Sequence, residues 1–309
     1  MKDSQDNILV SVIIPTYYRN DTLSRSIESV INQTYSNIEL IVVDDSGEKY
    51  AEDVVRRYDN IIYIHHNCNQ GPNAARSTGI DRSNGDYIQF LDDDDILFPT
   101  KIEKHVDLIT GRDECGVAYC AYKRENGSIS RQLNDPDGGV LEQALAMTLT
   151  CITSTMLIDK RIAEKITSLP DLPGSTDTFW KIEFSQKTNF CCLDEILVRK
   201  GIAPQQVSDS WGAISGTWMV LDRYEQLYEK YPSKVRKSAK AKAARREAKY
   251  HLNNKVWSYR AIKLSIYSAY SDPNNTKYTI LLPILSILGQ PGYKILNVIA
   301  HTYNRKLSS

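Results

Sequence analysis

The sequence has 309 residues, with 38 Lys and Arg against 38 Asp and Glu, so its formal charge is zero and it can build one large domain or one domain with an appendage. Without a global basic field, nucleic acid is excluded as the main partner. The six cysteines lack the paired spacing of a zinc site and the polar start lacks the apolar stretch of a secretory signal, so we expect reduced thiols in a cytoplasm.

The first elements alternate between strand and helix. Apolar, β-branched runs at 8–14, 38–43 and 61–64 predict buried strands. Apolar side chains at helical spacing predict helices over 23–31 and 51–58. Strand followed by helix, repeated, indicates parallel βαβ units.

A glycine-containing turn precedes the next helix. In the stretch 69–76, Gly71 permits a tight turn and Pro72 suits a first helical position. No GxGxxG follows the first strand and no GxxxxGK[ST] occurs in the sequence. A dinucleotide dehydrogenase and a P-loop enzyme are therefore disfavoured.

The apolar run 87–91 ends in four carboxylates, Asp92 to Asp95. Adjacent like charges repel and resist burial, so a compensating cation is expected. If the extended chain continues through Asp94, the period of a strand puts Asp92 and Asp94 on one face and Asp93 on the other. Mg²⁺ prefers one or two carboxylates plus phosphate oxygens, so the cluster predicts a metal-bridged diphosphate. An equally weighted alternative is a solvated acidic turn that caps the following helix.

Further elements extend the sheet. We expect a helix over 102–109, a strand over 116–122, a helix over 141–149, a strand over 153–158 and one or two strands over 190–198. The dipeptide Asn126-Gly127 is a hairpin signal, so antiparallel strands should join the sheet. Polar groups follow three strands, at 16–19, 44–45 and 92–95. Since ligands bind outside the carboxyl ends of strands in open α/β sheets, this convergence predicts a site there.

Four motifs occur in a recognisable order: Val10–Tyr17, Ile41–Ser46, Asn69–Gly79 and Gly85–Asp95. Together they closely resemble the family 2 glycosyltransferases, which have the GT-A nucleotide-sugar-binding fold. The resemblance is dense over roughly the first hundred residues and extends to about Ser210.

This resemblance implies an α/β, GT-A (Rossmann-like) fold with a mixed, mainly parallel sheet flanked by helices. The implied catalytic domain covers 1–212, with a nucleotide-sugar-binding half over about 1–115 and an acceptor half over about 116–212. An α-helical C-terminal appendage follows over 213–309.

Carried over by resemblance, the donor site consists of Pro15, Thr16, Tyr17, Arg19, Asp45, Arg76, Asp92 and Asp93. Tyr17 would pack its ring on the base, and Asp45 would accept hydrogen bonds from the base. Asp94 would bind Mg²⁺ or Mn²⁺ directly, with Asp92 reaching the ribose or the ion. Taken alone, Tyr17 is more often an ordinary strand-end aromatic and Asp45 a turn-forming residue.

The resemblance also implies a catalytic base. Family members place Glu-Asp at the start of a helix where this chain has Thr176-Asp177. The resemblance therefore assigns Asp177 as the general base. Because Thr176 replaces the first acid, the contacts with the acceptor stay undecided. Alternatively, Asp177 is a first-turn acid that stabilises the N-terminus of this helix. The family's His before a Ser is replaced by the stretch 205–208, so a diphosphate contact from there is expected to be weak or absent.

These residues imply an inverting glycosyltransferase. It would move a sugar from a nucleotide-diphospho donor, with a UDP-sugar expected, to a hydroxyl of a glycan or lipid-linked acceptor. One alternative is a catalytically silent nucleotide-sugar-binding or scaffold protein, which Thr176 and the missing His favour. A nucleotidyltransferase fits the Asp177 region poorly.

The C-terminal region changes character. Apolar side chains over 221–228 predict a helix that ends before Pro232. The Lys, Arg and Ala residues of 234–249 predict a second helix. The positive face of this second helix meets either lipid headgroups or water. The apolar stretch 279–289 is too short to span a membrane. In-plane membrane contact on the cytoplasmic face, burial against the catalytic domain and a homodimer contact are left open.

Overall fold

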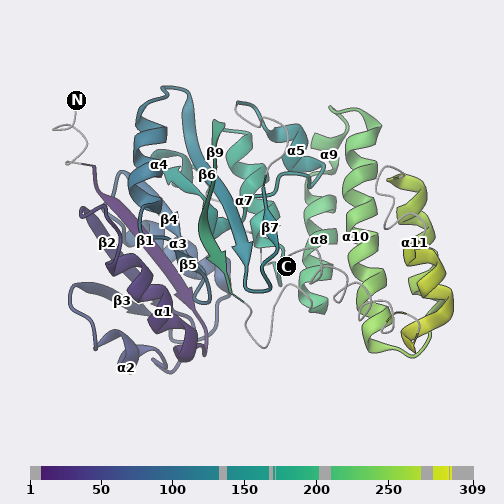
Figure 1. Cartoon of the computed structure of the whole chain (residues 1–309), viewed down its shortest axis with the longest axis horizontal. Helices are drawn as coiled ribbons and strands as arrows, with labels where there is room; N and C mark the ends of the chain where they lie inside the picture. Colours follow the sequence, from purple (N-terminus) through teal and green to yellow (C-terminus); the bar gives the residue numbers. More distant parts are fainter. Residues whose placement is uncertain are drawn as a thin grey trace. The chain divides into compact units, whose positions relative to one another are not determined.

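The computed structural model describes residues 8–131, 138–166, 170, 172–201, 210–272, 281–291 and 293. These residues belong to two compact units, and Figure 1 shows the helices and strands of both. We call them the sheet unit, Met1–Ala144 with Thr148–Gln206, and the helical unit, Leu145–Met147 with Val207–Ser309. The predicted domain limits at 115 and 212 stay a prediction.

The sheet unit is organised around one mixed sheet. Its strand order is β3-β2-β1-β4-β8-β6-β9-β5, with β7 paired to β6. The strands of the described residues are β1 Val10–Thr16, β2 Ile38–Asp44, β3 Ile61–His65, β4 Tyr87–Phe90, β5 Ile96–Leu97, β6 Cys115–Arg124, β7 Ile129–Ser130, β8 Leu157–Asp159 and β9 Asn189–Lys200. Strands β3, β2, β1 and β4 are parallel, and β8 runs antiparallel to both β4 and β6. The predicted mixed, mainly parallel α/β sheet is confirmed.

Helices connect and cover these strands (Figure 1). They are α1 Asn20–Ile31, α2 Glu52–Val55, α3 Pro72–Arg82, α4 Lys101–Thr110, α5 Leu141–Leu145, the 3₁₀ turn η1 Thr153–Thr155, α6 Lys160–Ala163 and α7 Thr176–Ser185. The alternation of β1 to β4 with α1 to α3 is the predicted βαβ pattern, because each parallel pair needs a crossover.

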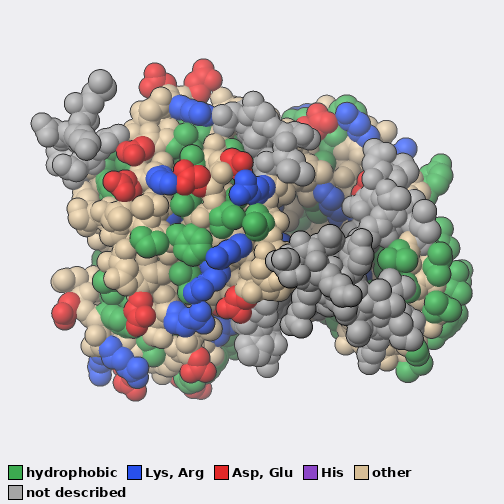
Figure 2. All heavy atoms as spheres, viewed as in Figure 1, with side chains coloured by type: hydrophobic (Ala, Val, Ile, Leu, Met, Phe, Trp, Pro, Cys, Tyr) green, Lys and Arg blue, Asp and Glu red, His purple; other side chains and the backbone are tan. Residues whose placement is uncertain are grey.

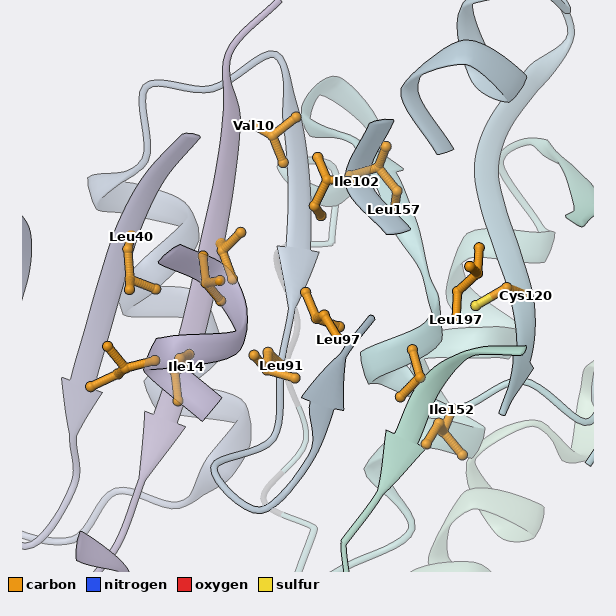
Figure 3. Packing of buried hydrophobic residues seen from close by; sticks show 14 of the residues in the cluster. Val10, Ile14, Leu40, Leu91, Leu97, Ile102, Cys120, Ile152, Leu157 and Leu197 are labelled. Atoms are coloured by element: carbon orange, nitrogen blue, oxygen red, sulfur yellow. The ribbon is translucent and has the colours of Figure 1, made fainter. Parts of the chain in front are cut away.

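Both faces of β1 are covered by helices. Val10, Val12 and Ile14 belong to the main apolar cluster together with side chains of α1 and α4 (Figure 3). Ile13 points the other way, where a Cβ built on Gly79 of α3 would lie 2.3 Å from its side chain. Only glycine therefore allows α3 to lie this close to the strand. Two-sided burial explains why β1 is a continuous apolar run in the sequence rather than an alternating one.

Several predicted elements differ in extent. The helix predicted over 141–149 ends at Leu145, and the strand predicted over 153–158 is divided between η1 and β8. The η1 turn forms because Thr155 Oγ1 donates to the carbonyl of Ile152 at 2.7 Å and accepts from its N–H at 3.1 Å. The predicted hairpin at Asn126-Gly127 is confirmed by the antiparallel pairing of β6 with β7.

Two cysteines depart from the expected reduced state. Cys115 and Cys191 form a disulfide between β6 and β9. Their Cα atoms lie 5.9 Å apart because the two strands are neighbours in the sheet, although 76 residues separate them in the sequence. Spacing along the chain cannot reveal such a pairing. The other four cysteines, Cys68, Cys120, Cys151 and Cys192, form no disulfide.

The helical unit contains α8 Trp211–Arg223, α9 Glu225–Tyr228, α10 Ser233–Asn254, α11 Tyr259–Ser271 and a helical segment at 282–291. Cations of α10 form hydrogen bonds and ion pairs within this unit. Lys242 donates to Met147 O at 2.8 Å, and Arg245 pairs with Asp272 at 2.9 Å. The positive face considered for this helix is therefore partly engaged within the unit. Of the described helices, none has the length and hydropathy that crossing a bilayer requires.

Candidate active site

The carboxyl ends of β1, β2, β4 and β9 lie at one edge of the sheet. Strand β9 is parallel to β6, which is antiparallel to β8, which is antiparallel to β4, so β9 and β4 point the same way. Polar residues stand at or just past each of these ends, at Thr16, Asp44-Asp45, Asp92 and Lys200. The structure thus adds a fourth strand end to the three that the sequence indicated.

Asp93 is held between β1 and the start of α1. Thr16 Oγ1 donates to Asp93 Oδ2 at 2.9 Å, and Arg19 Nη1 donates to Asp93 Oδ1 at 3.0 Å. Burial raises the pKa of Asp93 to about 6, although Arg19 and the Thr16 hydrogen bond lower it. Three of the residues predicted for the donor site therefore form one hydrogen-bonded group.

The four aspartates lie on a turn and not on an extended strand. Strand β4 stops before them, and Asp95 N donates to Asp92 O at 2.9 Å. The predicted alternation, with Asp93 facing away from Asp92 and Asp94, is therefore wrong, because a turn does not keep the two-residue period of a strand. Asp93 and Asp94 both face Arg19, whose Nη1 lies 3.7 Å from Asp94 Oδ2.

The aspartates do not cap the following helix. Thr100 is the N-cap residue of α4, and the acid in the first turn of this helix is Glu103. The alternative that these aspartates cap the following helix therefore has no support in the contacts of α4.

Asp92 and Asp94 place two carboxylates close to each other on the aspartate turn. Burial and the neighbouring charge of Asp92 raise the pKa of Asp94, as expected for carboxylates that lie close together. In the described part of the chain, no three His, Cys, Asp or Glu side chains converge on a metal site. Mg²⁺ and Mn²⁺ suit carboxylate oxygens, and Mg²⁺ needs only one or two when substrate phosphates complete its shell. Two carboxylates would therefore be sufficient.

Arg76 connects the aspartate turn to α7. Its guanidinium, on α3, is 4% exposed and donates to Asp92 Oδ1 at 2.7 Å. The same group lies 5.9 Å from the centre of the Phe90 ring and 3.5 Å from Thr176 Oγ1. Arg76 was predicted to border the nucleotide, and its contacts are with Asp92 and with the residue before Asp177.

Asp45 is buried at the end of β2 and orders the loop that precedes α3. Its Oδ1 accepts from Gln70 N at 2.9 Å and lies 2.7 Å from His66 Nδ1, while its Oδ2 accepts from Gly71 N at 2.8 Å. The turn-forming role considered for Asp45 is thus present. Oδ2 can accept one more hydrogen bond, so contact with a base is compatible with it. His66 was not singled out from the sequence.

Tyr17 lies at the surface just past β1, with 48% of its area exposed. Its ring meets Tyr18 edge-on at 4.7 Å between centroids, and Tyr18 in turn contacts Tyr50. Tyr18 has a φ of 53°, and its hydroxyl donates to Ser46 O at 3.1 Å, which helps to hold this strained conformation. Pro15 lies inside β1. The exposed ring face of Tyr17 is available for stacking.

Asp177 lies in the first turn of α7. Its Oδ1 accepts from both N and Oγ1 of Thr153, at 3.0 and 2.8 Å. Burial raises its pKa, but the charges of Lys200 and Lys181 outweigh this, so the pKa of Asp177 lies below its ordinary value. The carboxylate is therefore ionised at neutral pH. Among the described residues, its Oδ2 has no hydrogen-bond partner and can accept a proton.

Lys200 ends β9 and was not singled out from the sequence. Burial lowers its pKa, but the net pKa is raised by nearby carboxylates, those of Asp95, Asp92, Asp177 and Asp94. Its ammonium forms no ion pair within the described part of the chain, so it can still contact an anion. A polar residue after an apolar strand was the signal used at the other strand ends, and it would have found Lys200. The stretch 205–208 lies outside the described residues.

Comparisons with known proteins agree on one family. Residues 11–172 match the family model described as "Glycosyl transferase family 2". The chain is 24% identical over 293 residues to GalNAc(5)-diNAcBac-PP-undecaprenol beta-1,3-glucosyltransferase of Campylobacter jejuni, aligning 90% of this chain and 93% of that protein. It is 29% identical over 174 residues to the Escherichia coli UDP-Glc:alpha-D-GlcNAc-diphosphoundecaprenol beta-1,3-glucosyltransferase WfaP, aligning 56% and 68%.

Solved structures share the fold. S. aureus TarS 1-349 in complex with UDP-GlcNAc superposes with a TM-score of 0.64 at 16% identity, covering 89% of this chain and 84% of that one. The mannosyltransferase PcManGT from Pyrobaculum calidifontis, in complex with GDP-Man and Mn²⁺, gives a TM-score of 0.56 at 15% identity and covers 95% and 79%. At these identities the likeness concerns the arrangement of sheet and helices.

Proposed function

The chain belongs to glycosyl transferase family 2 and is a glycosyltransferase with the GT-A fold, and from this premise we propose an inverting transfer of a sugar from a nucleotide-diphospho donor to a hydroxyl of a glycan or lipid-linked acceptor. A UDP-sugar is the expected donor. One observation carries the proposal: Arg76 links Asp92 at 2.7 Å to Thr176 at 3.5 Å, and Thr176 adjoins Asp177. The residues proposed for the leaving group and for the base thus lie at the same strand edge.

In the proposed donor site, Tyr17 stacks on the base, and Pro15 and Thr16 line the edge of the same pocket. Asp45 accepts a hydrogen bond from the base through the remaining acceptor position of Oδ2. Support comes from the exposed ring of Tyr17 and from the bond between Asp45 N and Thr16 O at 2.9 Å, which brings the two strand ends together.

The diphosphate belongs beside Asp92 and Asp94, which would hold Mg²⁺ or Mn²⁺. When bound, the ion acts as a Lewis acid that stabilises the charge of the departing diphosphate. Arg19 and Asp93 fix the shape of the aspartate turn. Lys200 supplies a further positive charge at the same edge.

Asp177 is the proposed general base. Its ionised carboxylate takes the proton from the acceptor hydroxyl while that oxygen forms a bond to the anomeric carbon. The bond from this carbon to the diphosphate oxygen breaks, and its electron pair leaves with the nucleoside diphosphate. A single displacement inverts the anomeric configuration. Thr153 orients the carboxylate, which leaves Oδ2 free for the proton.

The relatives support one class of acceptor. Both named relatives act on substrates linked to undecaprenol by a diphosphate, which supports a lipid-linked acceptor for this chain. We accordingly propose a cytoplasmic enzyme that works at the membrane surface.

A panel of nucleotide sugars tests the function. In thermal-shift experiments with Mn²⁺, one donor should raise the Tm, and that donor should yield free nucleoside diphosphate once a suitable acceptor is supplied. If no nucleotide sugar stabilises the protein, the donor site is misassigned. Binding without release across lipid-linked and glycan acceptors would instead identify a silent nucleotide-sugar-binding protein.

A further inference from the structure

Helix α11 has its small side chains inside and its large apolar side chains outside. Ala261, Ser265 and Ser268 are fully buried, whereas the surface of the helix carries aromatic and branched apolar side chains besides Arg260 and Lys263. The exposed set comprises Tyr259, Ile266, Tyr267 and Tyr270, each between 40% and 86% exposed. Successive members of this set are seven, one and three residues apart, which places all four on one face of the helix. An ordinary surface helix shows the opposite arrangement.

The helical segment 282–291 is apolar on two sides. Leu282 and Leu285 are buried in a cluster with side chains of α10 and α11. Ile284, Ile287 and Leu288 are between 51% and 59% exposed. A helix that is apolar all round needs apolar surroundings on both sides, and the described residues supply only one of them.

The two helices belong to one surface region of the helical unit. Ser265 of α11 and Ser286 share a buried hydrogen bond of 2.8 Å. Trp257, in the loop before α11, donates from Nε1 to the carbonyl of Ile287 at 3.3 Å and is itself 56% exposed. Figure 2 shows hydrophobic side chains gathered over the part of the molecule where α11 lies. We call the exposed apolar side chains of 256–270 and 284–288 the apolar face.

Within the two segments that carry the apolar face the charges have a single sign, and Asp272, which follows α11, pairs with Arg245 of α10. Residues 253–271 and 281–291 contain three cations and no Asp or Glu. Arg260 pairs with Glu247 of α10, which leaves Lys255 and Lys263 exposed beside the apolar face. A second copy docked by twofold symmetry would bring the same cations to the contact, so repulsion disfavours that occupant. An anionic lipid surface complements both the apolar side chains and the cations.

We propose that the apolar face binds in the plane of a bilayer that contains anionic lipid, with its Tyr and Trp side chains at the headgroup level. Aromatic side chains with a polar tip prefer this level, and in-plane binding does not need a spanning helix. The inference does not depend on the proposed function, because vesicle binding can be measured on a protein without transferase activity.

Sedimentation of the full chain with vesicles tests the inference. The chain should pellet with vesicles containing phosphatidylglycerol and should pellet less with phosphatidylcholine alone. Ile266→Ser should weaken the binding about fivefold, because it removes a half-exposed apolar side chain from the lipid contact. Ile129→Ser is the matched control, since Ile129 of β7 is 51% exposed against 52% for Ile266. Equal losses in the two variants would overturn the proposal.

A charge reversal provides a second measurement that does not alter packing. Lys263→Glu should weaken binding to the phosphatidylglycerol vesicles, whereas Lys237→Glu, an exposed site on α10, should not. Analytical ultracentrifugation without lipid should give a monomer for the wild type. A dimer that Ile266→Ser dissociates would assign the apolar face to a second copy and refute the membrane contact.

Discussion

The sheet unit and the helical unit each have one region with an unusual distribution of side chains, and the two regions differ in kind. In the sheet unit, charged groups lie inside: Arg76, Asp93 and Asp95 are at most 4% exposed. In the helical unit, large apolar groups lie outside, and Tyr270 is 86% exposed. Burying a charge and exposing an aromatic ring both cost free energy, so neither arrangement is explained by folding alone.

The comparison supports a different proposed ligand for each unit. Buried carboxylates with raised pKa values gather at the strand edge, where a cation and a diphosphate would compensate them. In the described part of the helical unit the apolar stripe of α11 is exposed, and a bilayer is the partner of low polarity that we propose for it. Each departure therefore points to a different kind of ligand, and substitutions in the two units should have different readouts.

The largest effect is expected at the aspartate turn. Asp94→Ala should lower turnover by about 10³-fold and remove its dependence on divalent metal, because the diphosphate loses the several kcal/mol of stabilisation that a bound ion gives. Nucleoside diphosphate release at varied Mn²⁺ concentration measures this. Asp107→Ala, an exposed acid on α4, is the control. Full wild-type activity in excess chelator would contradict the role of Asp94.

Asp177→Asn should lower kcat by about 10²-fold while the donor binds almost as before, since the amide keeps the shape but cannot take a proton. Because the pKa of Asp177 lies below its ordinary value, the wild-type rate should not fall until the pH drops below that ordinary value. Single-turnover rates and donor titrations separate the two effects. A variant with normal kcat would show that another group is the base, and Asp53→Asn at an exposed position is the control.

Lys200→Met should weaken binding of the donor's nucleoside diphosphate about tenfold, the size of one lost charge-assisted contact. The substitution should also shift the acidic limb of the pH–rate profile to higher pH, because the charge of Lys200 lowers the pKa of Asp177. Calorimetry and a pH series measure the two changes. Lys200→Arg keeps the charge and should restore most of the binding. A methionine variant that binds like wild type would exclude contact with the diphosphate.

The sequence predicted the sheet unit well where local pattern decides structure. Strands β1, β2 and β4 are predominantly apolar because both faces of the sheet are covered, and a strand of this kind can be recognised without knowing its neighbours. Strand β5 was missed because its two residues pair with β9, far along the chain. The disulfide between Cys115 and Cys191 was missed for the same reason, since pairing of β6 with β9 creates it.

The candidate site was predicted by motif rather than by geometry. Strand periodicity assigned the wrong faces to the aspartates because the strand ends before Asp92, and a turn follows. Lys200 was missed because no motif includes it, although its position after an apolar strand carried the signal. In the helical unit, helix-favouring composition identified α10, but composition gives no indication that the cations of this helix are engaged by carbonyls and carboxylates of the same unit.

The smallest effect is expected at Tyr270. Tyr270→Ser should change the free energy of unfolding by less than about 0.5 kcal/mol, since the side chain is almost fully exposed in the folded chain. Ser265→Leu, on the buried side of the same helix, should destabilise the protein by about 1–3 kcal/mol, because the site is already filled and its hydroxyl bonds Ser286. Urea titrations measure both changes. A large loss for Tyr270→Ser would mean that its ring packs within the protein, and the contrast between the two units would then need another explanation.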